Sequence, residues 1–150
     1  MVVVHAGIVD CAPRALKKWE IKILSSNSLL KKASSIFIKK YTFSLRKTRN
    51  ITYTPLARFE KIAEDFSKRL QNKVHWIGIA PACSLYEEQV PNISSNIEKY
   101  NQSLQRIFGC NFIEMSDLES SSLMSDFHHL NKEGHKKVYD KLKKLIADLI

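Results

Sequence analysis

One short stretch near the end of the chain, residues 125–142, concentrates side chains suited to proton transfer. Within it, Asp126 and His129 are three residues apart. On a tight turn, the Asp126 carboxylate can accept a hydrogen bond from Nδ1 of the His129 ring, which fixes the tautomer and leaves Nε2 as a base. A Ser-His-Asp triad activates its nucleophile in this way. The spacing therefore predicts general-base chemistry at His129, with Asp126 as the orienting acid.

Two further histidines in this stretch raise metal binding as the alternative. His128 and His135 could join the Asp–His pair as ligands of a metal ion. The spacing fits no standard zinc pattern such as H-E-x-x-H, and adjacent histidines are expected to point apart. We therefore predict no metal and no cofactor, and we expect no chemistry from His128.

The residues that follow have the features of a helix start, predicted at about residue 132. Asn131 belongs to a residue type that caps helices, and Gly134 permits close approach to neighbouring backbone. His135 is three residues before Val138 on the predicted buried face, so we expect it to be a packed structural residue.

Buried strands alternate with amphipathic helices, which is the pattern of a parallel α/β sheet. Apolar runs predict three strands, at 2–9, 74–80 and 110–115. Helical periodicity predicts three helices, at 54–72, at 94–108 and from 132 to the end. Residues 14–50 mix apolar and basic side chains, and we predict one or two short helices there, inserted into an otherwise single domain of 150 residues.

The helix at 54–72 shows the most regular pattern. Thr54 can cap it, and Pro55 suits its first position. Four apolar residues at helical spacing are predicted to form its buried stripe: Phe59, Ile62, Phe66 and Leu70.

Two loops are expected to meet at one edge of the sheet, because functional groups of such sheets collect beyond the carboxyl ends of the strands. The sequence H-A-G-I-V-D-C-A-P-R (residues 5–14) overlaps the end of the first predicted strand, and the Asp126–His129 stretch follows the third. Arg14 could there bind an anionic or hydroxyl-rich substrate; the alternative is a surface arginine at a helix start.

The net charge of +9 is spread unevenly. Residues 14–73 hold 16 Lys/Arg against 4 Asp/Glu, whereas residues 74–131 hold 2 against 7. The basic part could attract nucleic acid, an anionic membrane surface or an acidic glycan, or it could be a solvated helical surface. No nucleic-acid motif accompanies it, so a nucleic-acid partner is not expected.

Other features indicate a cytoplasmic protein. No apolar run approaches the length that spans a bilayer, so we expect no membrane partner, and the N-terminal residues do not resemble a signal peptide. The cysteines Cys11, Cys83 and Cys110 are scattered and form no disulfide framework.

The sequence D-F-H-H-L-N-K-E-G-H (residues 126–135) resembles the last conserved block of the SGNH hydrolases, or GDSL esterases, whose pattern is D-x-x-H-L-N followed by G-H. The resemblance implies that Asp126 and His129 are the acid and base of a Ser-His-Asp triad. It also implies a three-layer, flavodoxin-like α/β/α fold and hydrolysis of acyl or O-acetyl esters without a cofactor.

A second match lies in residues 5–14, where Gly7 and Asp10 resemble the family block G-x-N-D at the oxyanion and substrate loop. The order of the intervening elements is also similar. The sequence I-V-D-C-A-P-R resembles a branch found in bacterial surface-polysaccharide gene clusters, which implies an acylated sugar as substrate.

Two departures from the family pattern matter. Val9 stands where the family has an oxyanion-binding Asn, and losing such a donor costs about 10²–10³ in rate. The family's nucleophilic Ser lies in an upstream G-D-S block, so the resemblance implies that this chain begins at the third strand and is a partial domain. Cys11 and Ser84 are the internal candidates for a replacement nucleophile, with a buried cysteine and an ordinary loop serine as the alternatives.

Two functions follow from these patterns. The first is an SGNH-type ester hydrolase of which this chain carries the His/Asp half. The alternative is a non-catalytic derivative that binds an anionic partner through its basic segment. The resemblance implies that the first two strands of the sheet are lacking, so the strand at 2–9 would be an exposed apolar edge. Such an edge predicts poor solubility, pairing into a homodimer, or an incomplete gene product.

Overall fold

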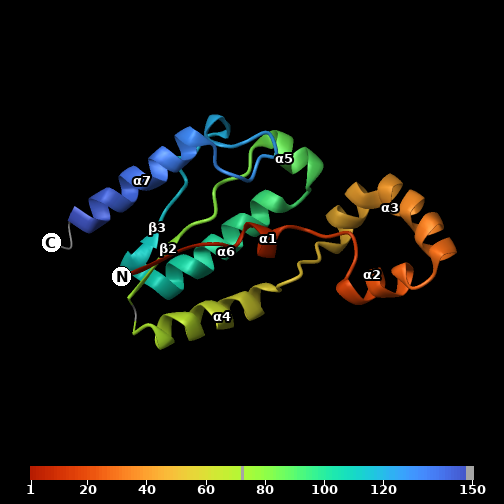
Figure 1. Cartoon of the computed structure of the whole chain (residues 1–150), viewed down its shortest axis with the longest axis horizontal. Coiled ribbons are helices and arrows are strands. Elements are labelled where there is room, and N and C mark those ends of the chain that lie inside the picture. The colour runs from red at the N-terminus through yellow and green to blue at the C-terminus, as the bar shows by residue number, and fades with distance from the viewer. Residues whose placement is uncertain (72, 148–150) are drawn as a thin grey trace.

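The computed structural model describes residues 1–71 and 73–147, which form a mixed α/β structure with a three-stranded parallel sheet packed by helices (Figure 1). The strands are β1 (Val2–His5), β2 (Val74–Ile77) and β3 (Phe112–Ile113), in the order β1-β2-β3. Val2 pairs with Val74, and Trp76 pairs with Phe112. The predicted parallel sheet is therefore confirmed.

Helices connect and flank the strands. The α-helices are α1 (Ile8–Cys11), α2 (Lys18–Ser25), α3 (Ser28–Arg49), α4 (Leu56–Arg69), α5 (Ser84–Gln89), α6 (Ile93–Phe108) and α7 (Lys132–Ala147). Two 3₁₀ turns are η1 (Gly109–Asn111) and η2 (Ser120–Ser122). No described helix combines the length and apolar character required to cross a bilayer.

Alternate residues of β2 face two apolar clusters, as the period of a strand requires. On one face, Trp76 packs against Phe59 of α4 and Phe108 of α6, with ring centroids 6.0 and 5.2 Å apart. On the other face, Ile77 packs with Met115 and with further apolar side chains: Leu118, Leu123, Leu130, Val138 and Leu142. Helices therefore cover both faces of the sheet.

Four predicted elements differ clearly in length, and among them β2 ends at Ile77 rather than residue 80. β1 ends at His5 rather than residue 9, because Gly7 adopts a φ of 131° and the chain turns into α1. β3 contains only two residues, because η1 occupies 109–111. α3 is one helix of 22 residues rather than a short one.

The helix α4 differs in its start and in its buried face. Pro55, not Thr54, occupies the capping position, because its ψ of 147° is still extended. Phe59, Ala63 and Ser67 form the buried face, at a spacing of four residues. Ile62 and Phe66 were therefore predicted wrongly as core residues, and they are 50% and 37% exposed.

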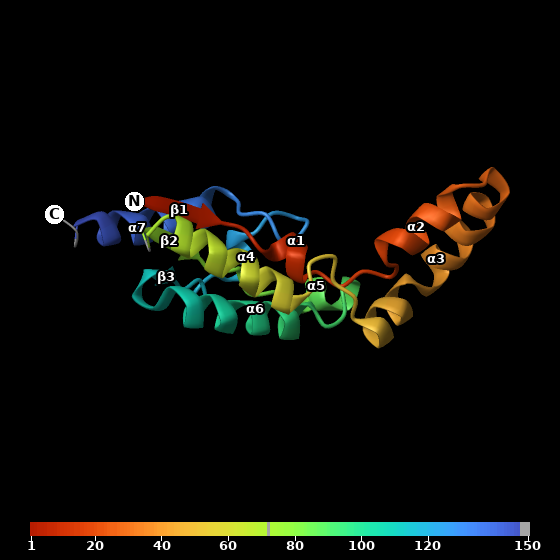
Figure 2. The same cartoon turned by 90° about the horizontal axis from the view of Figure 1, so that it is seen from below.

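The α2–α3 hairpin, residues 17–49, projects from the rest of the molecule (Figure 2). Internally, Arg49 forms an ion pair with Glu20 at 2.6 Å. Arg46 Nη1 donates to the carbonyl of Gln89 at 3.1 Å, which ties α3 to α5. We call the remainder of the described residues the α/β body.

The predicted helix at residue 132 is confirmed as α7, with Val138 and Leu142 packed against the sheet. Its predicted last residues, 148–150, lie outside the described residues, as does residue 72 at the end of the predicted helix 54–72. β1 lies at the edge of the sheet, where Val2 and Val3 are exposed.

Candidate functional site

A closed turn between η2 and α7 carries the Asp–His pair. Leu123 and Leu130 form an antiparallel bridge across its base, and Met124 N donates to His129 O at 2.7 Å. Phe127 has a φ of 63°, which reverses the chain at the tip. These contacts make the turn a defined platform for its side chains.

The Asp126 carboxylate accepts hydrogen bonds from three N–H groups. Oδ2 lies 2.7 Å from Nδ1 of His129, and Oδ1 accepts the backbone N–H groups of His129 at 3.0 Å and of His128 at 3.1 Å. The His129 side chain, and then the two backbone amides, hold the pKa of the Asp126 carboxyl well below its ordinary value. Asp126 is therefore ionised at neutral pH and can orient the imidazole, as the sequence predicted.

The helix start beside this turn also follows the prediction. Asn131 Oδ1 accepts the backbone N–H groups of Glu133 at 2.9 Å and Gly134 at 3.0 Å. A Cβ at Gly134 would collide with the carbonyl oxygen of Ser122, so the close approach requires glycine. The Asn131 amide further donates to the carbonyl of Leu123 at 3.1 Å, which joins the helix to the turn.

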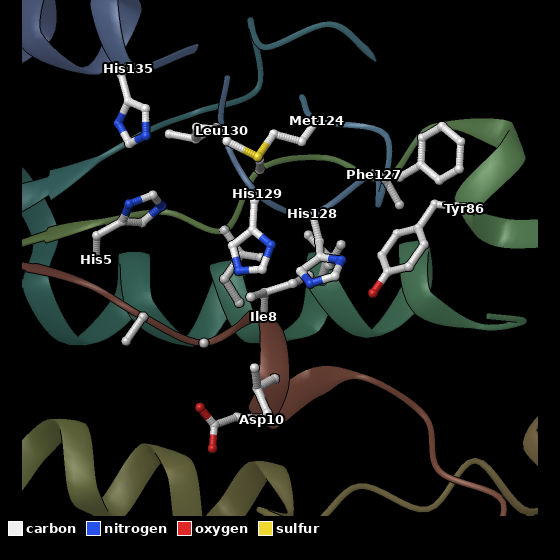
Figure 3. Close-up of a pocket in the computed structure, with 17 residues that line it drawn as sticks. His5, Ile8, Asp10, Tyr86, Met124, Phe127, His128, His129, Leu130 and His135 are labelled. Atoms are coloured by element: carbon white, nitrogen blue, oxygen red, sulfur yellow. The ribbon is translucent and has the colours of Figure 1, made fainter. Parts of the chain in front are cut away.

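A cavity of about 580 Å³ lies between this turn and the loop after β1 (Figure 3). His129 lines it from the turn, and Gly7, Ile8 and Asp10 line it from the first loop. The two loops therefore meet, as their places after parallel strands predicted. The His129 side chain is 66% exposed, so its Nε2 is accessible from the cavity.

The predicted oxyanion loop fits this cavity in part. Gly7 is buried at a φ of 131°, and a Cβ there would lie 2.7 Å from Cδ1 of Ile79, so only glycine suits the turn. Asp10 lies on the far side of Ile8 from His129 (Figure 3). Val9 is 61% exposed and has no polar atom in its side chain to stabilise an oxyanion.

Neither internal nucleophile candidate fits. Cys11 is fully buried, its thiol donates to the carbonyl of Ile8 at 3.3 Å, and burial raises its pKa to about 12. Ser84 begins α5 and does not line the cavity. Among the described residues that line it, there is no serine, threonine or cysteine.

His135 was predicted wrongly as a packed core residue. It is exposed and lines the cavity (Figure 3). There it faces His5, the last residue of β1. Burial, and then the charge of His135, lower the pKa of His5. The sequence reasoning missed His5, although its place at the carboxyl end of a strand was a usable signal.

The adjacent histidines also differ from expectation, because their rings lie 4.3 Å apart rather than pointing apart. Asp126, His128 and His129 each offer a ligand atom, and these atoms lie within 4.8 Å of one another. The Nδ1 atoms already contact oxygen atoms of Asp126, at 2.8 Å for His128 and 2.7 Å for His129. A metal ion bound through these atoms would have to replace the hydrogen bonds that orient the base.

Arg14 lines a neighbouring cavity of about 320 Å³ rather than the one containing Gly7 and Asp10. Asp126 and His128 line the same smaller cavity. The predicted site residues are therefore divided between two adjoining cavities, with the Asp–His turn between them.

Comparison of this chain with protein-family models, curated proteins and solved structures finds no match.

Proposed function

We propose that this chain supplies the base and the orienting acid of an SGNH-type ester hydrolase. The observation that carries the proposal is the 2.7 Å contact between Asp126 Oδ2 and His129 Nδ1 beside a cavity at the edge of a parallel sheet. The resemblance of residues 126–135 to the family's last block supports it independently. Helices on both faces of the sheet are compatible with the family's three-layer, flavodoxin-like fold.

In this proposal His129 acts twice. Its Nε2 removes the proton from a serine hydroxyl as the hydroxyl attacks the ester carbonyl, and then returns the proton to the departing alcohol. Asp126 stays ionised throughout and stabilises the imidazolium. The serine would come from a G-D-S block outside these 150 residues, because no described residue of the cavity supplies one.

The substrate would be an acyl or O-acetyl ester, and acylated carbohydrate is the class that the resemblance favours. Gly7 would form the tight turn of the oxyanion loop, and Asp10 would support that loop. Since Val9 has no side-chain donor, backbone N–H groups or residues outside these 150 would have to stabilise the oxyanion.

A serine-directed fluorophosphonate probe tests this assignment. The 150-residue chain should not be labelled, whereas a longer product of the same reading frame that includes a G-D-S block should be labelled at its serine. His129→Ala in the longer product should slow labelling, and His128→Ala is the matched control. A longer reading frame without a G-D-S block, or labelling unaffected by His129→Ala, would contradict the proposal.

A second function is favoured by the distribution of charge. Residues 14–49 hold 11 Lys/Arg and 1 acidic residue. A non-catalytic protein could bind an anionic partner through this segment, with an affinity that falls as salt is added. Ester hydrolysis that depends on His129 would exclude this alternative as the whole function.

A further inference from the structure

The smaller cavity beside the catalytic turn contains two arginines that come from distant parts of the chain. Arg14 follows α1, and Arg46 lies near the end of α3. We infer that Arg14 and Arg46 form a binding site for a phosphate or carboxylate group next to the Asp126–His129 pair.

Neutral contacts hold both guanidinium groups in place. Arg14 Nη2 donates to Val9 O at 3.4 Å, and the group lies over the Tyr53 ring, 5.1 Å from its centroid. Arg46 Nη1 donates to Gln89 O at 3.1 Å. These contacts fix the position of each cation, but they do not compensate its charge.

Each of the two groups also keeps a buried donor without a partner. The Nε atoms of Arg14 and Arg46 are buried and form no hydrogen bond among residues 1–71 and 73–147. Within the same residues neither arginine forms an ion pair, whereas Arg49 in the same helix is paired with Glu20. No described carboxylate therefore balances either charge, which leaves both guanidinium groups suited to an anionic ligand in the cavity that they line.

The two cations also act on one another. Burial, and then the charge of Arg14, lower the pKa of Arg46. An anion between the two groups would relieve their mutual repulsion. The planar fork of a guanidinium suits the paired oxygen atoms of a phosphate or carboxylate.

The surroundings of the pair allow a small anion to bind. Asp126 also lines the cavity and is an anion, but hydrogen bonds from three N–H groups partly offset its negative charge. The basic residues of 14–49 add a positive potential that would attract anions to this entrance. The cavity volume of about 320 Å³ suits one small group rather than a polymer.

The position of the site indicates a class of substrate. Because one cavity contains both the arginines and Asp126, an ester bound at His129 would carry its anionic group within reach of the arginines. The substrate would then be an acylated molecule with a phosphate or a carboxylate. This last step depends on the proposed esterase, whereas anion binding itself does not.

Titration calorimetry of the full 150-residue chain, with inorganic phosphate and acetate in separate experiments at low salt, tests the site. Arg14→Gln and Arg46→Gln should each weaken binding of the preferred anion by about tenfold or more, because each removes a charge-assisted fork. The matched control is Lys47→Gln, which removes the same charge from the exposed neighbour of Arg46 and should change affinity less than about twofold.

Arg46→Lys keeps the charge and removes the fork, so it reports on the site even if the glutamine variants fold poorly. It should lower affinity while leaving the circular dichroism spectrum unchanged. The inference is overturned if neither anion binds, or if Lys47→Gln weakens binding as much as the arginine variants do.

A further variant separates this inference from the proposed function. Anion affinity that falls in the arginine variants would support the site even where His129→Ala leaves the activity of the longer enzyme unchanged, an outcome that would refute the esterase alone. Loss of activity in the longer enzyme on His129→Ala, together with unaltered anion affinity in the arginine variants, would refute the site and leave the esterase standing.

Discussion

The α/β body and the α2–α3 hairpin are built on different principles. Every described member of the two apolar clusters belongs to the body. The hairpin exposes large apolar side chains instead, among them Trp19, Ile36 and Phe37. Residues 14–49 carry 11 Lys/Arg against 1 acid, whereas the rest of the chain carries 13 against 14. The net positive charge of the protein therefore lies on and beside the hairpin.

This difference indicates that the two regions contribute different properties to the protein. The body's packed core fixes the sheet edge and the Asp126–His129 turn, which require precise geometry. The hairpin is attached through polar contacts such as the hydrogen bond from Arg46 to the Gln89 carbonyl. It contributes positive charge and no residue of the two apolar clusters. The two regions meet where Arg14 and Arg46 line a cavity with Asp126.

The largest expected effect on stability contrasts one residue from each region. Leu104→Ala should lower the free energy of unfolding by about 2–5 kcal/mol, because Leu104 is fully buried between α6 and the sheet. Trp19→Ala should change it by less than about 0.5 kcal/mol, because that side chain is mostly exposed. Urea denaturation measures both. Equal losses would show that the hairpin belongs to the same cooperative core.

A smaller effect is expected where α7 contacts the Asp126–His129 turn. Gly134→Ala should destabilise the body by about 1–3 kcal/mol, because the added methyl group meets the Ser122 carbonyl and that backbone cannot move freely. Glu133→Ala, at the exposed neighbour, is the control. A neutral result for Gly134→Ala in thermal unfolding would mean that the turn is loosely packed.

The response of the turn to acid should be local. The pKa of Asp126 is lower in the folded than in the unfolded state, so its contribution to stability is complete above the ordinary carboxyl pKa of about 3.9. That contribution is lost as pH falls below this value toward the folded pKa. The protection of the His128 and His129 amides against hydrogen exchange, corrected for the intrinsic effect of pH, should fall in this range, and Asp126→Asn should abolish that fall. Unchanged protection in acid would contradict the hydrogen bonds to Asp126.

The smallest effect concerns self-association. We expect weak dimerisation through the exposed β1 edge rather than through the hairpin, whose like charges repel a second copy. Val3→Lys should shift sedimentation velocity profiles toward monomer, and Phe37→Lys should not. A shift toward monomer in Phe37→Lys but not in Val3→Lys would assign the interface to the hairpin.

Short-range spacing in the sequence predicted the part of the site that local geometry determines. Asp126, His129 and Asn131 act within one turn, so three-residue spacings were sufficient to assign them. The parallel sheet followed from alternation, because a buried strand and an amphipathic helix have different periods.

The remaining features depend on tertiary packing. The exposure of His135 depends on which side of α7 meets the sheet, and the contact between the His128 and His129 rings depends on the positive φ of Phe127. Arg46 is far from Arg14 in sequence, and residues 14–50 gave no clear periodicity. No local pattern could therefore join the two arginines in one cavity.

The central claim, that Asp126 and His129 form the acid–base pair of an esterase, is tested most directly by kinetics. The measurement is kcat/KM for a chromogenic acetate, using a polypeptide in which these 150 residues are joined to a G-D-S block. His129→Ala should lower kcat/KM by about 10²–10⁴, the usual contribution of a general base. His128→Ala should lower it by less than about tenfold, because that ring does not carry the proton. Equal losses in the two variants, or full activity in His129→Ala, would contradict the account.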